Sequence, residues 1–240
     1  MRQHVVVLTG AGVSADSGLA TFRGAGGLWE GRRVEDVATP EAWARDPHAV
    51  WRFYQERRGL LRAVEPNAAH RALTRLEREC AAAGHDCTLI TQNVDDLHER
   101  AGSSPIHVHG ELARLRCEAC GEVVRDTEHT DTEVFVSCAA CEHPRLRPDV
   151  VWFGEVPHHL DAIERALETC TGFAAVGTSG VVWPVAGFLL HARARGAATW
   201  VNALEEPENL APQDRFLPGR ASDVVPGLVD RLLEQLSGAR

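Results

Sequence analysis

Short runs of apolar residues recur along this chain without the polar alternation of a sheet that has one face in water. They lie at 5–8, 87–90, 150–153, 173–176 and 199–201. Strands that are covered on both faces carry such runs, and this is typical of a parallel sheet. We therefore expect these runs to be the strands of one parallel sheet.

Helical patterns lie between the runs. Apolar residues share one helix face over 69–83, where Asn67 is placed to cap the start of the helix. Similar patterns occur at 160–167 and, behind Pro226, at 229–236. Alternating strands and helices predict an α/β fold built on a Rossmann-like, doubly wound parallel sheet.

Two stretches break this alternation. Residues 28–66 are rich in Trp and Arg, and residues 111–147 contain four cysteines. We expect a single domain over 1–240 in which a helical insertion (28–66) and the cysteine segment (111–147) form a smaller lobe. The larger lobe would comprise approximately 1–27, 67–110 and 148–240.

The composition of the chain limits the kinds of partner that it can bind. The chain has 240 residues, of which 44% are hydrophobic, enough for a buried core. Its 34 acidic residues outnumber the 25 Lys and Arg residues, so the surface should repel phosphate backbones and anionic lipids. No run has the length of a membrane span, and the N-terminal residues lack the long apolar region of a signal peptide. We expect a monomer that binds neither nucleic acid nor membrane.

Four of the seven cysteines form two Cys-x-x-Cys pairs separated by seventeen residues. This spacing is typical of a zinc ribbon with four thiolate ligands, which leaves no open coordination position. A structural Zn²⁺ would be held by Cys117, Cys120, Cys138 and Cys141. Metal-binding thiols indicate a reducing compartment, so we expect a cytoplasmic protein.

A glycine-rich turn follows the first apolar run. Gly10, Gly12 and Ala15 fit the pattern G-x-G-x-x-A, in which glycines bring backbone N–H groups close to a pyrophosphate. A glycine turn without a ligand would contain the same residues. The next segment has too many breakers for the long helix of a dehydrogenase, and a loop carrying Phe22 and Arg23 over a nucleotide fits it better.

Polar side chains follow other apolar runs. Gln92, Asn93 and Asp95 would lie at the carboxyl end of a parallel strand, where ligands bind in such folds, although Asn and Asp also cap helices. His109 ends another short apolar segment, although a single histidine can also be a packed or surface residue. Alternation along a strand places His107 on the opposite face.

These motifs occur in the order of the sirtuin family. The stretch GAGVSADSGLATFRG at 10–24 resembles the sirtuin NAD-binding signature, TQNVD at 91–95 resembles TQNxD, and His109-Gly110 resembles the HG of the family. The resemblance spans nearly the whole chain. It implies an enzyme that consumes NAD to remove acyl groups from protein lysines, releasing nicotinamide and O-acyl-ADP-ribose.

The resemblance also implies individual roles. His109 would be the catalytic base that takes a proton from a ribose hydroxyl, and Asn93 would hold the ribose and a water. Phe22 would shield the reacting sugar carbon, and Arg23 would order the loop and contact NAD. The other NAD contacts would come from Gly10, Ala11, Gly12, Ser14, Gln92, Asp95, Gly177, Thr178, Ser179, Asn202, Ala221 and Ser222.

The segment VVWFGE at 150–155 resembles the sirtuin segment that pairs with the backbone of an acyl-lysine peptide by strand addition. By this resemblance the substrate would contact Val151, Trp152, Phe153 and Gly154. An ordinary core strand would also account for Val151 and Phe153.

One pair bears on the acyl group. Tyr54 and Arg57 are three positions apart, so on a helix both can reach one carboxylate, although a solvated basic helix would have the same spacing. Tyr-x-x-Arg resembles class III sirtuins, which remove succinyl and malonyl groups, and Ala38 matches a small residue that leaves room for the longer chain. We therefore predict desuccinylase and demalonylase activity beside deacetylase activity.

Three other functions share some of these features. An NAD-dependent dehydrogenase would carry the glycine turn, but the sequence shows no second substrate domain. A non-catalytic NAD-binding adaptor could use the zinc ribbon, although the chain retains the whole catalytic set. A mono-ADP-ribosyltransferase would use the same activated sugar and differ in its products.

Overall fold

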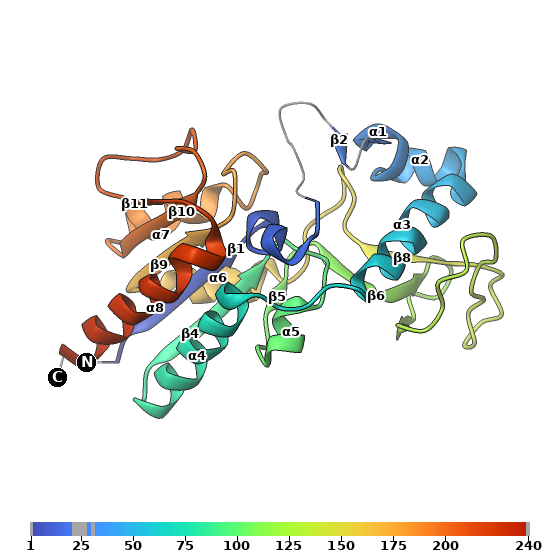
Figure 1. The fold of residues 1–240 in the computed structure, drawn as a ribbon. Coiled ribbons are helices and arrows are strands. Elements are labelled where there is room, and N and C mark those ends of the chain that lie inside the picture. The colour runs from blue at the N-terminus through green and yellow to red at the C-terminus, as the bar shows by residue number, and fades with distance from the viewer. Residues whose placement is uncertain (1, 21–27, 30–31, 239–240) are drawn as a thin grey trace.

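Six parallel strands form the main sheet of the computed structural model, which describes residues 2–20, 28–29 and 32–238 (Figure 1). In chain order the strands are β1 (His4–Thr9), β4 (Asp86–Thr91), β5 (Ile106–His107), β9 (Gly172–Val176), β10 (Ala198–Ala203) and β11 (Arg215–Pro218). They lie in the order β11-β10-β9-β1-β4-β5, and every neighbouring pair is parallel. Read from the β5 edge, this is the doubly wound order 3-2-1-4-5-6, so the predicted fold class is confirmed.

Helices cover both faces of this sheet (Figure 1). The first face is covered by α4 (Ala68–Ala82) and α8 (Ala221–Gly238), and the second by α6 (Leu160–Glu168) and α7 (Gly187–Ala194). Val5 and Val7 pack in the core of the first face, whereas Val6 and Leu8 pack in the core of the second. Successive side chains of a strand point to opposite faces, so β1 needs an unbroken apolar run.

A second, antiparallel sheet lies beside the helical insertion (Figure 1). It contains β6 (Gly110–Cys117), β7 (Val123–Arg125) and β8 (Leu146–Val150) in the order β7-β6-β8. The insertion consists of the strands β2 (Leu28–Trp29) and β3 (Arg32–Arg33) and the helices α1 (Val34–Val37), α2 (Pro40–Arg45) and α3 (Pro47–Leu61). A third hydrophobic core joins the helical insertion to the antiparallel sheet, through residues such as Trp43, Trp51, Tyr54, Leu115 and Trp152.

Two expected elements differ from the structure. The run at 150–153 is not a strand of the main sheet, because β8 ends at Val150 and the segment beyond it packs against the aromatic core of the insertion. The last helix does not start behind Pro226 but at Ala221. Proline removes one backbone hydrogen bond, yet Val225 and Leu228 pack against the main sheet on both sides of it and hold the helix together.

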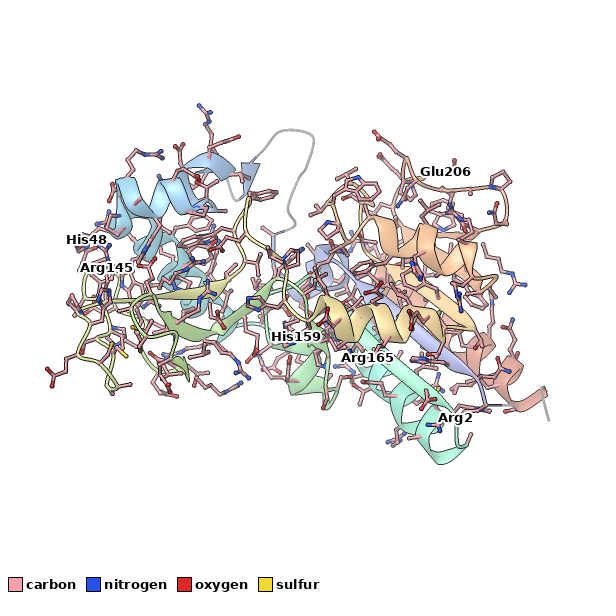
Figure 2. All side chains as sticks on the ribbon, turned by 180° about the vertical axis from the view of Figure 1, so that it is seen from behind. Arg2, His48, Arg145, His159, Arg165 and Glu206 are labelled. Atoms are coloured by element: carbon pink, nitrogen blue, oxygen red, sulfur yellow. The ribbon has the colours of Figure 1, made fainter. Side chains whose placement is uncertain are left out.

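The two parts of the molecule lie at opposite ends (Figure 2). Arg2 and Glu206 lie at the end that carries the main sheet, and His48 and Arg145 lie at the other end. His159, which precedes α6, lies between them. Within the described ranges, none of the helices combines the length and the apolar character needed to cross a membrane.

Candidate active site

The glycine turn lies between β1 and β9, where the strand order of the main sheet reverses. The Gly10 N–H donates to the Val176 oxygen (3.0 Å), and the Gly12 N–H donates to the Gly177 oxygen (2.8 Å). A Cβ on Gly12 would lie 2.7 Å from the Gly177 Cα, so only glycine allows this approach. The short helical turns η1 (Ala11–Val13) and η2 (Ala15–Ser17) follow. Ligands bind at such a switch point in doubly wound sheets.

A cavity of about 1060 Å³ opens at this point, as large as the biggest pockets for small molecules and cofactors, roughly 300–1,000 Å³. Its lining brings together the predicted residues Gly10, Ala11, Gly12, Ser14, Ala38, Tyr54, Arg57, Gln92, Asn93, Asp95, His109, Val151, Trp152, Phe153, Gly154, Gly177, Thr178, Ser179, Asn202 and Ala221. Ser222 does not line the cavity, but its hydroxyl donates to Asp16, which does (2.7 Å). Phe22 and Arg23 lie outside the described residues.

Ser14 is the centre of a buried polar network on one wall of the cavity. Its hydroxyl accepts a hydrogen bond from Asn93 Nδ2 (3.0 Å) and donates one to Asp95 Oδ2 (3.0 Å). Burial raises the pKa of Asp95 to about 6, opposed by hydrogen bonds from the Leu97 N–H and from Ser14. The network thus fixes three predicted NAD-binding side chains relative to one another.

His70, which the sequence analysis did not single out, supports this network. Its Nδ1 accepts the Asn67 N–H (3.2 Å), so the neutral ring carries its hydrogen on Nε2, which lies 3.5 Å from the Ser14 hydroxyl oxygen. Burial lowers the pKa of His70 to about 4, which keeps the ring neutral at pH 7. The signal in the sequence is the capping box at the start of α4, Asn67-x-x-His70.

His109 follows the short strand β5 and lines the cavity. Its Nδ1 lies 3.0 Å from the Gln92 backbone oxygen. Because a carbonyl only accepts, Nδ1 carries the hydrogen and the neutral ring keeps its lone pair on Nε2. Burial lowers the pKa of His109, which the hydrogen bond to Gln92 partly opposes. The side chain is therefore a neutral base of defined tautomer at pH 7.

His107 points away from the cavity, as the alternation predicted. Its Nδ1 lies 2.9 Å from the Asn93 carbonyl oxygen and its Nε2 lies 2.6 Å from Glu99 Oε1. Burial opposes a charge on this ring, but the hydrogen bond and the charge of Glu99 raise the pKa of His107. Glu99 lies on the short helix α5 (Leu97–Ala101). Glu99 thus holds the His107 ring in place, and the ring in turn holds the backbone of Asn93 through its other nitrogen.

The helix α3 brings Tyr54 and Arg57 to the wall of the cavity. Tyr54 is fully buried and accepts a hydrogen bond from Trp152 Nε1 (2.9 Å), and burial raises the pKa of its phenol. Arg57 is 6% exposed, donates to the Phe53 carbonyl (2.5 Å) and stacks over the Phe53 ring. The alternative interpretation, a basic helix exposed to solvent, is therefore wrong.

The predicted substrate segment connects the two sides of the cavity. The Val151 N–H donates to the His109 oxygen (2.9 Å), and the Phe153 N–H donates to the Ala38 oxygen (3.0 Å). Ala38 is buried, and its small side chain lies on the same cavity as Tyr54. The segment thus lies between the predicted base and the predicted acyl pocket.

The four predicted zinc ligands converge outside this cavity. All their Sγ atoms lie within 4.8 Å of one another, with 3.6 Å between Cys117 and Cys141 and 3.7 Å between Cys120 and Cys138. These thiols are not joined as disulfides. Four sulfurs at about 2.3 Å from a tetrahedral zinc would be about 3.8 Å apart, so the cluster fits a structural Zn²⁺.

The model of the Sir2 family matches residues 10–184, which contain the glycine turn, the polar strand ends, His109 and the four cysteines. This chain belongs to the Sir2 family. Curated relatives in this family include a protein of Vibrio vulnificus (strain YJ016) named NAD-dependent protein deacylase, 48% identical over 98% of this chain and 95% of its own length. A protein of Caulobacter vibrioides with the same name is 49% identical over 97% and 98%.

Solved structures of the Sir2 family share the fold. A mutant Sir2 homologue in complex with ADP-ribose has a TM-score of 0.88 and 40% identity, covering 98% of this chain and 93% of its own. A Sir2 homologue in complex with NAD has a TM-score of 0.85 and 39% identity, covering 97% and 90%. Sir2Af2 bound to a myristoylated histone peptide has a TM-score of 0.72 and 29% identity, covering 99% and 93%.

Proposed function

We propose that this Sir2 protein is an NAD-dependent protein-lysine deacylase that removes acetyl, succinyl and malonyl groups and produces nicotinamide and O-acyl-ADP-ribose. One observation carries the proposal: His109, a neutral base of defined tautomer, lines the same cavity as Ser14, Asn93 and Asp95. Curated relatives named NAD-dependent protein deacylase, and family structures with ADP-ribose, NAD and an acylated peptide, support it.

In this reaction the acyl oxygen of the lysine bonds to the ribose carbon of NAD while the bond to nicotinamide breaks. His109 Nε2 takes the proton from a ribose hydroxyl, whose oxygen then bonds to the acyl carbon. Water completes the release of lysine and O-acyl-ADP-ribose. Gln92 and Asn93 hold the ribose, and Asp95 accepts from the nicotinamide carboxamide, so its buried charge is paired. Zn²⁺ supports the fold and takes no part in these steps.

The acyl class rests on Tyr54, Arg57 and Ala38. A phenol and a guanidinium three positions apart on α3, both lining the cavity, suit a terminal carboxylate, and Ala38 leaves room for the longer chain. A charge-assisted hydrogen bond contributes about 1.5–3 kcal/mol, or roughly ten-fold to more than a hundred-fold in preference. We infer that succinyl and malonyl groups are recognised here.

Mass spectrometry of matched acetyl-lysine and succinyl-lysine peptides incubated with NAD tests the proposal. We expect NAD-dependent removal of both groups by the parent protein and neither by His109→Tyr. The variant Tyr54→Phe/Arg57→Met should lose succinyl turnover selectively, and unchanged succinyl turnover in it would remove the acyl assignment. Formation of NADH would indicate a dehydrogenase, and ADP-ribose attached to protein would indicate a transferase.

We also propose that the protein acts as a monomer in the cytoplasm, on acylated protein lysines and without nucleic acid. Its cysteines are free, which suits a reducing compartment, and its net charge of −9 disfavours phosphate backbones. The division into lobes at the bounds expected from the sequence belongs to the same proposal.

A further inference from the structure

The carboxylate of Glu155 fixes the segment that follows β8. Both of its oxygens accept hydrogen bonds from the buried Arg147 guanidinium, at 2.7 and 2.9 Å. One of them also accepts a hydrogen bond from the backbone N–H of Trp152, at 2.8 Å. Burial opposes the charge, but these donors hold the pKa of Glu155 below its usual value. A bidentate pair with a further backbone contact constrains orientation as well as position. The backbone of Trp152 is therefore held at a defined angle.

The same arginine fixes the indole ring. The Arg147 Cζ lies 3.4 Å from the centroid of the Trp152 ring, a stacked cation–π geometry. Arg147 also donates to the Val150 oxygen (2.8 Å), so it holds the backbone two residues before Trp152 as well. Both side chains are buried. Because the plane of the indole is fixed, the direction of its N–H is fixed too.

The indole N–H of Trp152 donates a hydrogen bond to the phenol oxygen of Tyr54, with 2.9 Å between the two heavy atoms. An indole nitrogen donates and never accepts, so the phenol oxygen is the acceptor and its own hydrogen must point elsewhere than Trp152. Burial raises the pKa of Tyr54, so the phenol keeps its hydrogen throughout the physiological pH range. Trp152 thus decides on which side of its oxygen Tyr54 can donate.

We propose that Trp152 is a specificity-determining residue, which orients Tyr54 as a hydrogen-bond donor to the terminal carboxylate of a dicarboxylic acyl group on lysine. This inference rests on the proposed function and deepens its acyl site. A carboxylate needs donors only, so a phenol turned the other way would present lone pairs to it. Arg147 is paired with Glu155, and Arg57 lines the same cavity as Tyr54 and Trp152.

A double-mutant cycle tests the orientation. The ratio of kcat/KM for succinyl-lysine over acetyl-lysine peptide is measured for the parent, Trp152→Phe, Tyr54→Phe and the double variant. We expect Trp152→Phe to lower this ratio roughly ten-fold, mainly through a higher KM for the succinyl peptide, and to lower it no further in the Tyr54→Phe background. A role in packing alone would lower both activities together and leave the ratio unchanged, which would overturn the inference.

A spectroscopic readout does not depend on turnover, because Tyr54 is the one tyrosine of the chain. Protein labelled with ¹³C at the tyrosine Cζ gives a single resonance that responds to hydrogen bonding of the phenol. We expect this resonance to shift in Trp152→Phe, and in the parent to shift on addition of succinyl-lysine peptide but not of acetyl-lysine peptide. A resonance that is the same in parent and Trp152→Phe overturns the role of Trp152.

The two proposals fail in different ways. A parent protein that turns over acetyl-lysine but neither turns over nor binds the succinyl peptide overturns the proposed acyl class, and this inference with it. Succinyl turnover by the parent, with the same succinyl-to-acetyl ratio in Trp152→Phe, overturns only the role of Trp152. Thermal melting of each variant shows whether a loss of activity comes from unfolding. In a variant that is partly unfolded, the Cζ resonance of the folded fraction still tests the role of Trp152.

Discussion

The backbone oxygen of Gln92 accepts a hydrogen bond from Nδ1 of His109, with 3.0 Å between the two atoms. A carbonyl cannot donate, so this contact decides which nitrogen of the neutral ring carries the hydrogen. Gln92 follows β4, whereas His109 follows β5, so the ends of these two strands hold the imidazole ring in place. The tautomer of His109 is therefore set before any substrate binds, which leaves Nε2 ready to accept a proton.

The pH dependence of catalysis should reflect two buried groups. In the proposed reaction both groups act unprotonated: His109, whose pKa is lowered by burial, and Asp95, whose pKa is raised to about 6. We expect kcat/KM for acetyl-lysine peptide to fall at acid pH more steeply than for a single proton, with the limb below the usual histidine pKa of about 6.5. In Asp95→Asn, which cannot titrate, the slower reaction should show a single-proton limb. A limb centred above about pH 7 would contradict the environment of His109.

The long elements of the fold could be predicted because their residues are covered by neighbours in a regular way. The strand β1 is an apolar run because both of its faces are buried, and α4 shows helical periodicity and a cap at Asn67. The strand β11 has only four residues, too few to show a pattern. The run at 150–153 was misread because periodicity reports that a segment is buried and not what covers it.

The site was predictable as far as it depends on strand ends. Parallel strands bring their carboxyl ends to one edge, so Asn93, His109 and Gly177 had to lie near the glycine turn. The contact of Trp152 with Tyr54 joins residues 98 positions apart and depends on how α3 packs against the segment that follows β8. The hydrogen bond from Ser222 to Asp16, which lines the cavity, likewise could not be predicted without the tertiary structure.

Two buried histidines should make the protein sensitive to acid. Burial lowers the pKa of His70 to about 4 and that of His98 to about 3, and the two rings are 4.8 Å apart. The unfolded chain, with a histidine pKa of about 6.5, binds more protons than the folded chain below that pH. Stability should therefore fall as the pH drops from about 6.5 towards the folded pKa values, by up to about 1.4 kcal/mol per pH unit for each ring.

The variant His98→Gln separates this effect from general acid unfolding. Its amide can still pair with the Thr9 hydroxyl, which lies 3.0 Å from His98 Nε2, but it does not titrate. We expect the urea midpoint of the parent to drop more between pH 7 and pH 5 than that of His98→Gln. The exposed His159, changed to Asn, serves as the control and should behave as the parent. Equal drops in parent and His98→Gln would contradict a proton linkage at this ring.

Two glycines should respond in opposite ways to alanine. A Cβ on Gly12 would lie 2.7 Å from the Gly177 backbone, so Gly12→Ala should cost about 1–3 kcal/mol and weaken NAD binding. Gly227 lies inside α8 with nothing within 4 Å of its added Cβ, so Gly227→Ala should stabilise by about 0.5–1 kcal/mol. Urea unfolding and calorimetric titration with NAD measure both effects. Destabilisation of similar size in both variants would contradict the close contact at the switch point.

Removal of zinc should unfold the part of the molecule around β6 to β8. The four cysteines do not line the cavity, so no group of the proposed reaction is removed. Cys117 ends β6 and packs in the aromatic core that also contains Trp152, so loss of the metal should loosen the substrate segment as well. We expect one zinc per chain by elemental analysis, loss of zinc and a lower melting temperature in Cys141→Ala, and recovery after chelation when zinc is returned. Cys87→Ala, at a partly buried cysteine outside the cluster, is the matched control and should keep its zinc. A metal-free protein with an unchanged melting temperature and unchanged deacylation would show that the four thiols do not hold a structural ion.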